Sequence, residues 1–271
     1  MSDKITVLVA AMNQDNFSLI EKMRLNTPAV IGNQCNECSN KYFNFQNEKY
    51  VYINRTDRGI SKNRNEALAF IDSGIVTFAD EDMIFVDNYD QIIKKAFAEV
   101  PDADGIIFNL NTIGYGVHGD GRRVNKKIKR IRKYNVLNYG VTRLSVKATS
   151  IKCANIVFHE YFGSGSKYCQ YGEDSIFLMD MLKKGLKIYS YPIYIADTDQ
   201  TSSTWFNGYD NKFLYDKGFL FYEIFKNLAI LLCIQDLIRH PYLYRNNDLT
   251  MIQALKIMRK GIYDYKKLKK R

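Results

Sequence analysis

Apolar and polar positions follow two patterns over residues 5–110. Short unbroken runs of aliphatic and β-branched side chains, typical of strands buried on both faces, are separated by stretches with helical spacing. The predicted strands cover 5–11, 29–32, 50–54, 75–79 and 106–110, and the predicted helices cover 16–25, 61–72 and 87–100. Strands and helices that alternate with short connections predict an α/β fold, in which helices flank a mostly parallel sheet.

The rest of the chain is less regular and is predicted to end in helices. A helix is expected over 173–184, a strand over 186–191 that ends before Pro192, and helices over 220–238 and 248–260. The last helix has Asp248 as its predicted N-cap and Gly261 just past its end. We therefore predict an α/β domain over residues 1–210 and a helical C-terminal extension over 211–271.

The chain carries a formal net charge of +10, because 39 Lys and Arg residues outnumber 29 Asp and Glu residues. The excess comes from residues 122–133, with eight basic and no acidic side chains, and residues 249–271, with eight basic and one acidic. Such segments suit an anionic partner, whether phosphate groups, an acidic membrane face or nucleic acid. Apolar residues near helical spacing in 249–271 predict contact with an anionic membrane surface, and packing on the preceding domain is the alternative.

Cysteine usage and hydropathy indicate the compartment. Five cysteines in a chain of 271 residues do not form the framework of a small secreted domain. The apolar run at the start is too short for a secretory signal, and charged residues interrupt the apolar stretch 218–238, so no membrane span is expected. We therefore expect a cytoplasmic protein, with peripheral attachment to the inner face of the cell membrane as a further hypothesis.

Three consecutive acids, Asp80, Glu81 and Asp82, follow the predicted strand 75–79 directly. Ligands of open α/β sheets bind at the carboxyl ends of the strands. Carboxylates at positions i and i+2 suit Mg²⁺ or Mn²⁺ bridging phosphate oxygens. The triplet therefore predicts a divalent metal site, and a solvated acidic turn is the alternative.

A basic segment opens the predicted helix 61–72. Ser61 is its predicted N-cap, and Arg64 shares an otherwise apolar helix face with Leu68 and Ile71. A helix N-terminus with a nearby Arg predicts an anion site. A structural ion pair made by Arg64 is the alternative.

The third candidate site is Glu173-Asp174, at the start of the predicted helix 173–184 and just after the Gly-rich stretch 162–166. One of these carboxylates can act as a general base that deprotonates a hydroxyl. The alternative is that both acids are placed there by the helix dipole.

These motifs, in this order, resemble the inverting family 2 glycosyltransferases of the GT-A fold. The resemblance spans about residues 5–205, and it is carried by Ala11-Met12-Asn13 at the end of the first strand, GISKNRNEAL at 59–68, FADED at 78–82 and GEDSIFLMDMLKKG at 172–185. It implies a GT-A fold, a nucleotide-sugar donor, a divalent metal (Mn²⁺ or Mg²⁺) and direct displacement with inversion, in polysaccharide or glycolipid biosynthesis.

The resemblance also implies roles for individual residues. Asp174 matches the general base and Glu173 its acidic neighbour. The implied donor-binding residues are Ala11, Asn13, Gln34, Arg58, Ser61, Arg64, Asp80 and Glu81, with Arg64 beside the diphosphate. Asp80 and Asp82 match the metal motif. Asp197 or Asp199 stands where the family often has a metal-binding His, and we take Asp199 as the expected third metal ligand.

The chain departs from the family after the second strand. Many members have an Asp-Asp-Gly-Ser turn there, and this chain has 32–36, GNQCN. The Gln34 amide can still pair with a uracil edge, so a UDP-sugar is the expected donor. The expected acceptor is a saccharide or a lipid-linked saccharide, given the basic C-terminus, and no nucleic-acid partner is expected.

Two other functions are compatible with parts of the sequence. A nucleic-acid-binding protein would use the basic segments 122–133 and 249–271, but it would leave the acidic motifs without a role. A sugar nucleotidyltransferase would also use acids at a strand end and a metal, but the first strand is not followed by a Gly-rich basic loop. The pattern G-x-G-x-x-G at 114–119 lies far from the first strand, so a dinucleotide-binding fold is not expected.

Overall fold

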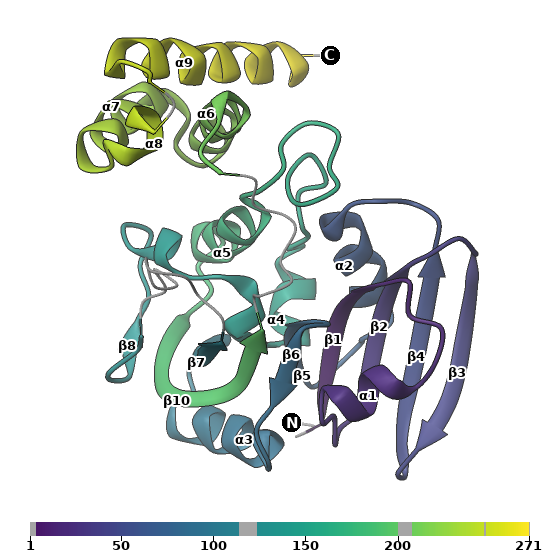
Figure 1. The fold of residues 1–271 in the computed structure, drawn as a ribbon. Coiled ribbons are helices and arrows are strands. Elements are labelled where there is room, and N and C mark those ends of the chain that lie inside the picture. Colours follow the sequence, from purple (N-terminus) through teal and green to yellow (C-terminus); the bar gives the residue numbers. More distant parts are fainter. Residues whose placement is uncertain (1–3, 114–123, 200–207, 247, 271) are drawn as a thin grey trace. The chain divides into compact units, whose positions relative to one another are not determined.

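The computed structural model describes residues 4–113, 124–199, 208–246 and 248–270. The chain forms two compact units, which are described separately (Figure 1). The sheet unit comprises Met1–Glu160 and Glu173–Ser202, and the helical unit comprises Tyr161–Gly172 and Ser203–Arg271. Residues 161–172, which the predicted boundary at 210 leaves in the first domain, thus belong with the C-terminal helices.

The sheet unit is built on one mixed β-sheet. In the described residues its strands are β1 (Ile5–Met12), β2 (Ala29–Gln34), β3 (Ser39–Phe45), β4 (Glu48–Arg55), β5 (Ile75–Asp80), β6 (Met83–Phe85), β7 (Gly105–Ile113), β8 (Lys129–Arg130), β9 (Leu144–Lys147) and β10 (Ile188–Asp199). Their order is β3-β4-β2-β1-β5-β9-β7-β10-β6, and β8 pairs with β10. Strands β4, β2, β1 and β5 form parallel ladders, as do β7 and β10, whereas β9 pairs antiparallel with both β5 and β7. The predicted α/β fold class is confirmed.

Helices pack on both faces of this sheet. They are α1 (Ser18–Lys22), α2 (Ile60–Leu68), α3 (Tyr89–Glu99), α4 (Ala148–Cys153) and α5 (Glu173–Lys183). On β1, alternate residues from Ile5 to Ala11 share a buried core with α1 and α3. The other face includes Phe78 of β5, whose ring contacts Phe177 of α5 and Phe158 edge to face. Burial on both faces explains why these strands are unbroken apolar runs in the sequence.

Strand β10 differs from the predicted strand 186–191, because it continues past Pro192 to Asp199. Its pairing with β7 shifts register between Ser190 and Tyr194 and again between Tyr194 and Ala196. A proline has no N–H to give to a ladder, and a bulge is where a strand tolerates one. The expected stop at Pro192 is therefore an irregularity within one strand.

The helical unit contains α6 (Asn211–Phe225), α7 (Ala229–Arg239), α8 (Tyr242–Arg245) and α9 (Met251–Leu268). The predicted single helix 220–238 is two helices, because Lys226 adopts a left-handed φ of 50° after α6. Helix α9 begins later than predicted: Thr250 is its N-cap and forms a capping box with Gln253.

Gly261 does not end α9 as predicted but lies inside it, at a close contact between helices. A Cβ atom at Gly261 would overlap the backbone carbonyl of Tyr215 in α6, and one at Gly218 of α6 would overlap that of Met258 in α9. Two glycines, one on each helix, thus let the backbones of α6 and α9 approach closely.

The stretch Asn211–Arg239 is, among the described residues, long and apolar enough by length and composition to cross a membrane. This differs from the expectation that no segment qualifies. The same stretch bends at Lys226, and its residues supply the core of the helical unit together with Ala254, Met258 and Ile262 of α9. A core helix of this kind meets the same criteria, so the observation alone assigns no membrane span.

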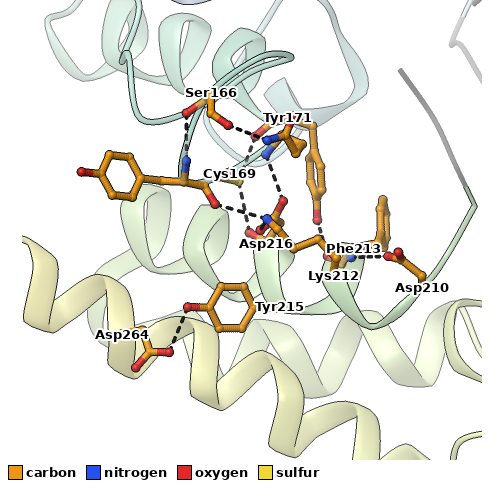
Figure 2. A network of polar contacts seen from close by, with 11 residues as sticks. Ser166, Cys169, Tyr171, Asp210, Lys212, Phe213, Tyr215, Asp216 and Asp264 are labelled. Atoms are coloured by element: carbon orange, nitrogen blue, oxygen red, sulfur yellow. Dashed lines mark hydrogen bonds and ion pairs between the residues drawn. The ribbon is translucent and has the colours of Figure 1, made fainter. Parts of the chain in front are cut away.

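Residues 161–172 form a loop that is fastened to α6 (Figure 2). Asp216 of α6, 1% exposed, accepts a hydrogen bond from the backbone N–H of Gln170 at 2.9 Å and pairs with Lys212. The Tyr171 hydroxyl donates to the carbonyl of Phe213 at 2.7 Å. Because the next residue in the chain after this loop is Glu173, the helical unit holds the segment that leads directly into α5.

Candidate active site

Four charged side chains of the sheet unit meet where β5 ends and α5 begins. The guanidinium group of Arg64, on α2, donates from Nη2 to Asp80 Oδ1 at 2.8 Å and from Nη1 to Asp174 Oδ1 at 2.9 Å. Glu173 Oε1 lies 3.7 Å from the same Nη1. We call these four residues the Arg64 cluster. It joins the acidic triplet and the Glu173-Asp174 pair, which are about ninety positions apart in the sequence.

The Arg64 side chain is 2% exposed and occupies the centre of the cluster. Helix α2 starts at Ile60, one residue before the predicted start, and its N-cap is Gly59 with φ 121°, not Ser61. Burial alone would lower the pKa of Arg64, but the carboxylates of Asp80, Asp174 and Glu173 together raise it, so the guanidinium is firmly charged. The sequence placed Arg64 beside a donor diphosphate; in the structure it bridges carboxylates.

Glu173 is the more deeply buried of the two acids that open α5. Burial raises the pKa of its carboxyl, the neighbouring Asp174 raises it further, and Arg64 opposes both effects. A raised pKa means that Glu173 holds a proton more readily than an ordinary glutamate does. Within the pair, Glu173 is therefore the acid suited to remain neutral.

Asp174 is fixed through both of its carboxylate oxygens. Oδ1 accepts from Arg64, and Oδ2 accepts the backbone N–H of Val141 at 2.9 Å. A Cβ atom at the adjacent Gly140 would lie 3.0 Å from Oδ2, so the backbone passes close to the carboxylate. An ionised carboxylate has about four lone-pair positions, and positions remain on both oxygens for a further donor such as a hydroxyl.

The other two acids of the triplet turn in different directions. Glu81 Oε2 accepts from the backbone N–H of Met12 at 3.2 Å and from the Gln14 side chain at 2.7 Å, which ties the triplet to the end of β1. Asp82 Oδ2 accepts from the Thr198 hydroxyl on β10 at 3.3 Å. The three acids are thus kept apart by different partners, which relieves their mutual repulsion.

The predicted donor-binding residues lie at the carboxyl ends of β1, β2 and β4. Ala11 is buried near the end of β1, and Asn13, with φ 53°, donates its backbone N–H to the carbonyl of Gln34 at 3.0 Å. The Gln34 side chain accepts the N–H of Gly59 at 2.8 Å, and Arg58 donates to the Gln34 carbonyl at 3.0 Å. Ser61 is buried in the first turn of α2.

Two further amides at this edge were missed from the sequence. Asn33 and Asn54 are buried side by side on β2 and β4, and the Asn33 amide donates to Asn54 Oδ1 at 2.8 Å. Asn33 also accepts the N–H of Gln14 and donates to its carbonyl. Each Asn ends an apolar run, and only the parallel register that places them opposite each other shows that they act together.

The residues proposed for the metal do not form a closed cage. In the part of the chain that the structure describes, no three His, Cys, Asp or Glu side chains are grouped to hold a metal ion. Asp197 instead accepts from the Asn111 amide at 3.1 Å, and the Asp199 side chain lies outside the described positions. The carboxylates of Asp80 and Asp82 still fit a Mg²⁺-like cation, which is commonly held by one or two carboxylates together with water and substrate phosphates.

The sheet unit has a mixed α/β fold, and the Arg64 cluster lies at the carboxyl end of the parallel strand β5. Solved structures of S. aureus TarS, a glycosyltransferase, are similar to this chain. TarS 1–349 in complex with UDP-GlcNAc matches with a TM-score of 0.58 and 16% identity, over 90% of this chain and 74% of that one. TarS 1–349 in complex with UDP matches with a TM-score of 0.60 and 16% identity, over 90% and 73%.

A longer TarS structure matches with a TM-score of 0.58 and 16% identity, and this chain spans 44% of its length. No family model matches the sequence, and no curated protein matches it either. At 16% identity the likeness shows the fold, and this confirms the α/β sheet with flanking helices and a helical C-terminal part expected from the sequence.

Proposed function

We propose that the chain is a glycosyltransferase that moves a sugar from a nucleotide-diphosphate donor to an acceptor hydroxyl with inversion. The observation that carries the proposal is the Arg64 cluster, because it holds an acid at the end of a parallel strand next to a candidate general base at the start of a helix. The likeness of the fold to TarS structures that contain UDP-GlcNAc or UDP supports a UDP-sugar as the donor.

The edge formed by β1, β2 and β4 would bind the nucleotide. Gln34, Asn33 and Asn54 place amide groups there, and amides can both donate to and accept from a uracil edge. Arg58, which the sequence also singles out, donates to the Gln34 carbonyl and so places a cation at this edge.

Asp174 would act as the general base. As the acceptor oxygen attacks the anomeric carbon, the bond from that carbon to the donor phosphate oxygen breaks, and the acceptor proton passes to Asp174 while the nucleoside diphosphate leaves. Arg64 and the N–H of Val141 hold the carboxylate in place, and Glu173, whose raised pKa lets it keep its own proton, does not compete with Asp174 for the acceptor proton.

Asp80 and Asp82 would hold a divalent cation together with the donor phosphates. Such an ion, when bound, neutralises negative charge on the leaving diphosphate. Arg64 has a different role in this proposal: it is a positioning residue that sets the distance between the Asp80 and Asp174 carboxylates.

Calorimetric titration with UDP, UDP-GlcNAc, GDP and ADP, each with Mn²⁺ and with EDTA, tests donor binding. We expect UDP compounds to bind, and to bind more tightly with Mn²⁺. Asp174→Asn should retain UDP binding and lose transfer, because an amide cannot accept the proton. A protein that binds none of these nucleotides, or an Asp174→Asn variant with full transfer activity, would contradict the proposal.

A further inference from the structure

A second site lies on the sheet unit, away from the acidic motifs. It is a cavity of about 410 Å³ whose lining includes the side chains of Lys126, Lys127, Lys129 and Arg130. We call it the basic cavity. Volumes of this size accommodate small-molecule ligands, and four cations in the lining favour an anionic one.

The four cations have no acidic partner among the residues that the structure describes. In the described part of the chain no acidic side chain forms an ion pair with any of them. The Asp102 carboxylate interacts electrostatically with Arg130, but it forms its ion pair with Lys187, at 3.2 Å. Like charges held together without a counter-ion repel one another, so a bound anion would relieve a cost that is present in the empty protein.

The backbone that carries these cations is anchored on both sides. Before them, Asn125 is 5% exposed; its backbone N–H donates to Asn109 Oδ1 at 2.8 Å, its carbonyl accepts from the Asn109 amide at 3.0 Å, and its side chain donates to the Ile107 carbonyl at 2.9 Å. After them, the N–H of Ile131 bonds the Ile188 carbonyl at 2.8 Å. A solvated loop would not need such buried anchors, so the cavity is a formed site.

The middle of the segment is also held in place. The hydroxyl of Ser190, on β10, donates to the carbonyls of Lys127 and Lys129 at 3.1 and 3.2 Å. Strand β8 pairs with the start of β10, with Arg130 opposite Tyr189. The backbone that carries the lysines is therefore held in place before a ligand arrives, and Lys129 and Arg130 extend from a strand.

One residue that lines the cavity is close in the sequence to a residue that contacts the candidate base. Tyr139 lines the cavity, and two residues later the N–H of Val141 bonds Asp174. Arg143 lies over the Tyr139 ring and donates to Asn109, the same residue that anchors Asn125. The cavity and the candidate base thus share one short, buried support.

We propose that the basic cavity binds the phosphate group of a phosphate-bearing saccharide acceptor. This rests on the proposed function, because it assigns the acceptor side of the same reaction. Lysine and arginine supply charge-assisted hydrogen bonds to phosphate oxygens, and the Tyr139 ring and the Asn135 amide, which also line the cavity, suit the hydroxylated part of the same molecule.

Binding of glucose 6-phosphate, with glucose as the neutral control, tests the proposal by titration at saturating UDP. Saturating UDP occupies any site for the donor phosphates, so glucose 6-phosphate cannot bind there. If the protein binds no UDP, the titration is run without it. In both cases the result does not depend on the donor assignment. We expect glucose 6-phosphate to bind, glucose not to bind, and the affinity to fall as salt rises.

The double substitution Lys127→Gln with Lys129→Gln should weaken this binding about tenfold or more, a decade corresponding to about 1.4 kcal/mol. Its matched control is Lys256→Gln with Lys260→Gln on α9, which removes the same charge from exposed positions and should change nothing. Equal affinities of the wild type and the Lys127/Lys129 variant, or equal losses in both variants, would overturn the proposal.

Two further ligands distinguish the source of the phosphate. Binding to vesicles with phosphatidylglycerol should not depend on Lys127 and Lys129. If vesicle binding does depend on them and glucose 6-phosphate does not bind, the cavity binds a lipid headgroup and the acceptor assignment is wrong. A short poly-U RNA that binds more tightly than glucose 6-phosphate through the same two lysines would likewise overturn it.

Discussion

At the scale of single residues, the candidate site depends most on Arg64. Its guanidinium fork reaches Asp80 with one nitrogen and Asp174 with another, a geometry that a lysine ammonium cannot reproduce. Removing the cation would leave two or three carboxylates facing one another across a buried gap.

We therefore expect Arg64→Met to lower the free energy of unfolding by about 3 kcal/mol, in the range for breaking a buried ion pair from one side. Urea denaturation measures the change. The matched control is Lys152→Met, which breaks an exposed pair with Asp72 and should cost less than about 1 kcal/mol. Equal losses in the two variants would show that the Arg64 pairs are not stabilising.

The raised pKa of Glu173 predicts a pH dependence with a definite sign. The folded state binds this proton more tightly than the unfolded chain does, so the free energy of unfolding falls as the pH rises above the ordinary carboxyl pKa of 4.5. Glu173→Gln cannot ionise and lacks this effect.

Urea midpoints of the wild type and Glu173→Gln, followed from about pH 4 to about pH 8, should therefore be similar at the acid end and diverge above it, with the variant the more stable. A difference that stays constant with pH would show that Glu173 titrates normally.

Residue patterns along the chain singled out the acids and Arg64 as candidate site residues, because strand ends and helix starts can be recognised in the sequence. They did not predict which acid Arg64 meets, nor the pairing of Asn33 with Asn54. Both depend on which strands are neighbours, and that information is absent from any local pattern. The capping role of Gly59 was missed for a related reason, since Ser61 has the better local signal.

At the scale of elements, strands β1, β2, β4, β5 and β7 were predicted to within three residues at each end, because their runs are apolar on both faces, whereas β10 continues past its predicted end at residue 191. Strand β3 was missed because most of its residues are polar and exposed, as suits an edge. Strand β9 has four residues, too few for a pattern. The break between α6 and α7 and the inclusion of Gly261 in α9 both follow from packing, which overrides the local helix signals.

The loop 161–172 gives a prediction at this scale. Asp216→Asn should weaken the pairing with Lys212 and the hold on the N–H of Gln170, so hydrogen exchange of residues 166–172 should speed up. The matched control is Asp264→Asn, which replaces the carboxylate that accepts from the Tyr215 hydroxyl by a neutral amide on the α9 side of α6 (Figure 2).

Exchange measured by mass spectrometry on both variants distinguishes the two positions. Faster exchange of the loop in Asp264→Asn as well would mean that the whole helical unit loosens. Unchanged exchange in Asp216→Asn would mean that Asp216 does not anchor the loop.

At the scale of the whole molecule, the positive charge is carried on two separate surfaces. One is the basic cavity, and the other is the exposed face of α9, which carries Lys256, Arg259, Lys260 and Lys267. Ala254, Met258 and Ile262 of α9 share a buried core with residues of α6 and α7, and contact of the basic face with a membrane stays a prediction.

We expect the protein to sediment with vesicles that contain anionic lipid and not with neutral ones. Each basic residue near an anionic leaflet contributes about 1 kcal/mol, so Lys256→Gln, Lys260→Gln and Lys267→Gln together should weaken binding on the order of 100-fold. The same number of substitutions at Lys126, Lys127 and Lys129 is the control. Equal effects of the two triple variants, or no binding at all, would contradict a membrane role for α9.

The division of the chain into units has a consequence for how the protein is made. The loop 161–172 is synthesised before α6, whose residues Phe213 and Asp216 hold it. At roughly 5–20 residues per second, these partners arrive about two to nine seconds later. Throughout that interval β10 can complete the sheet while the segment ahead of Glu173 has nothing to pack on. The sheet thus forms on a nascent chain in which the segment that leads into α5 is still untethered, and the synthesis of α6 fixes it.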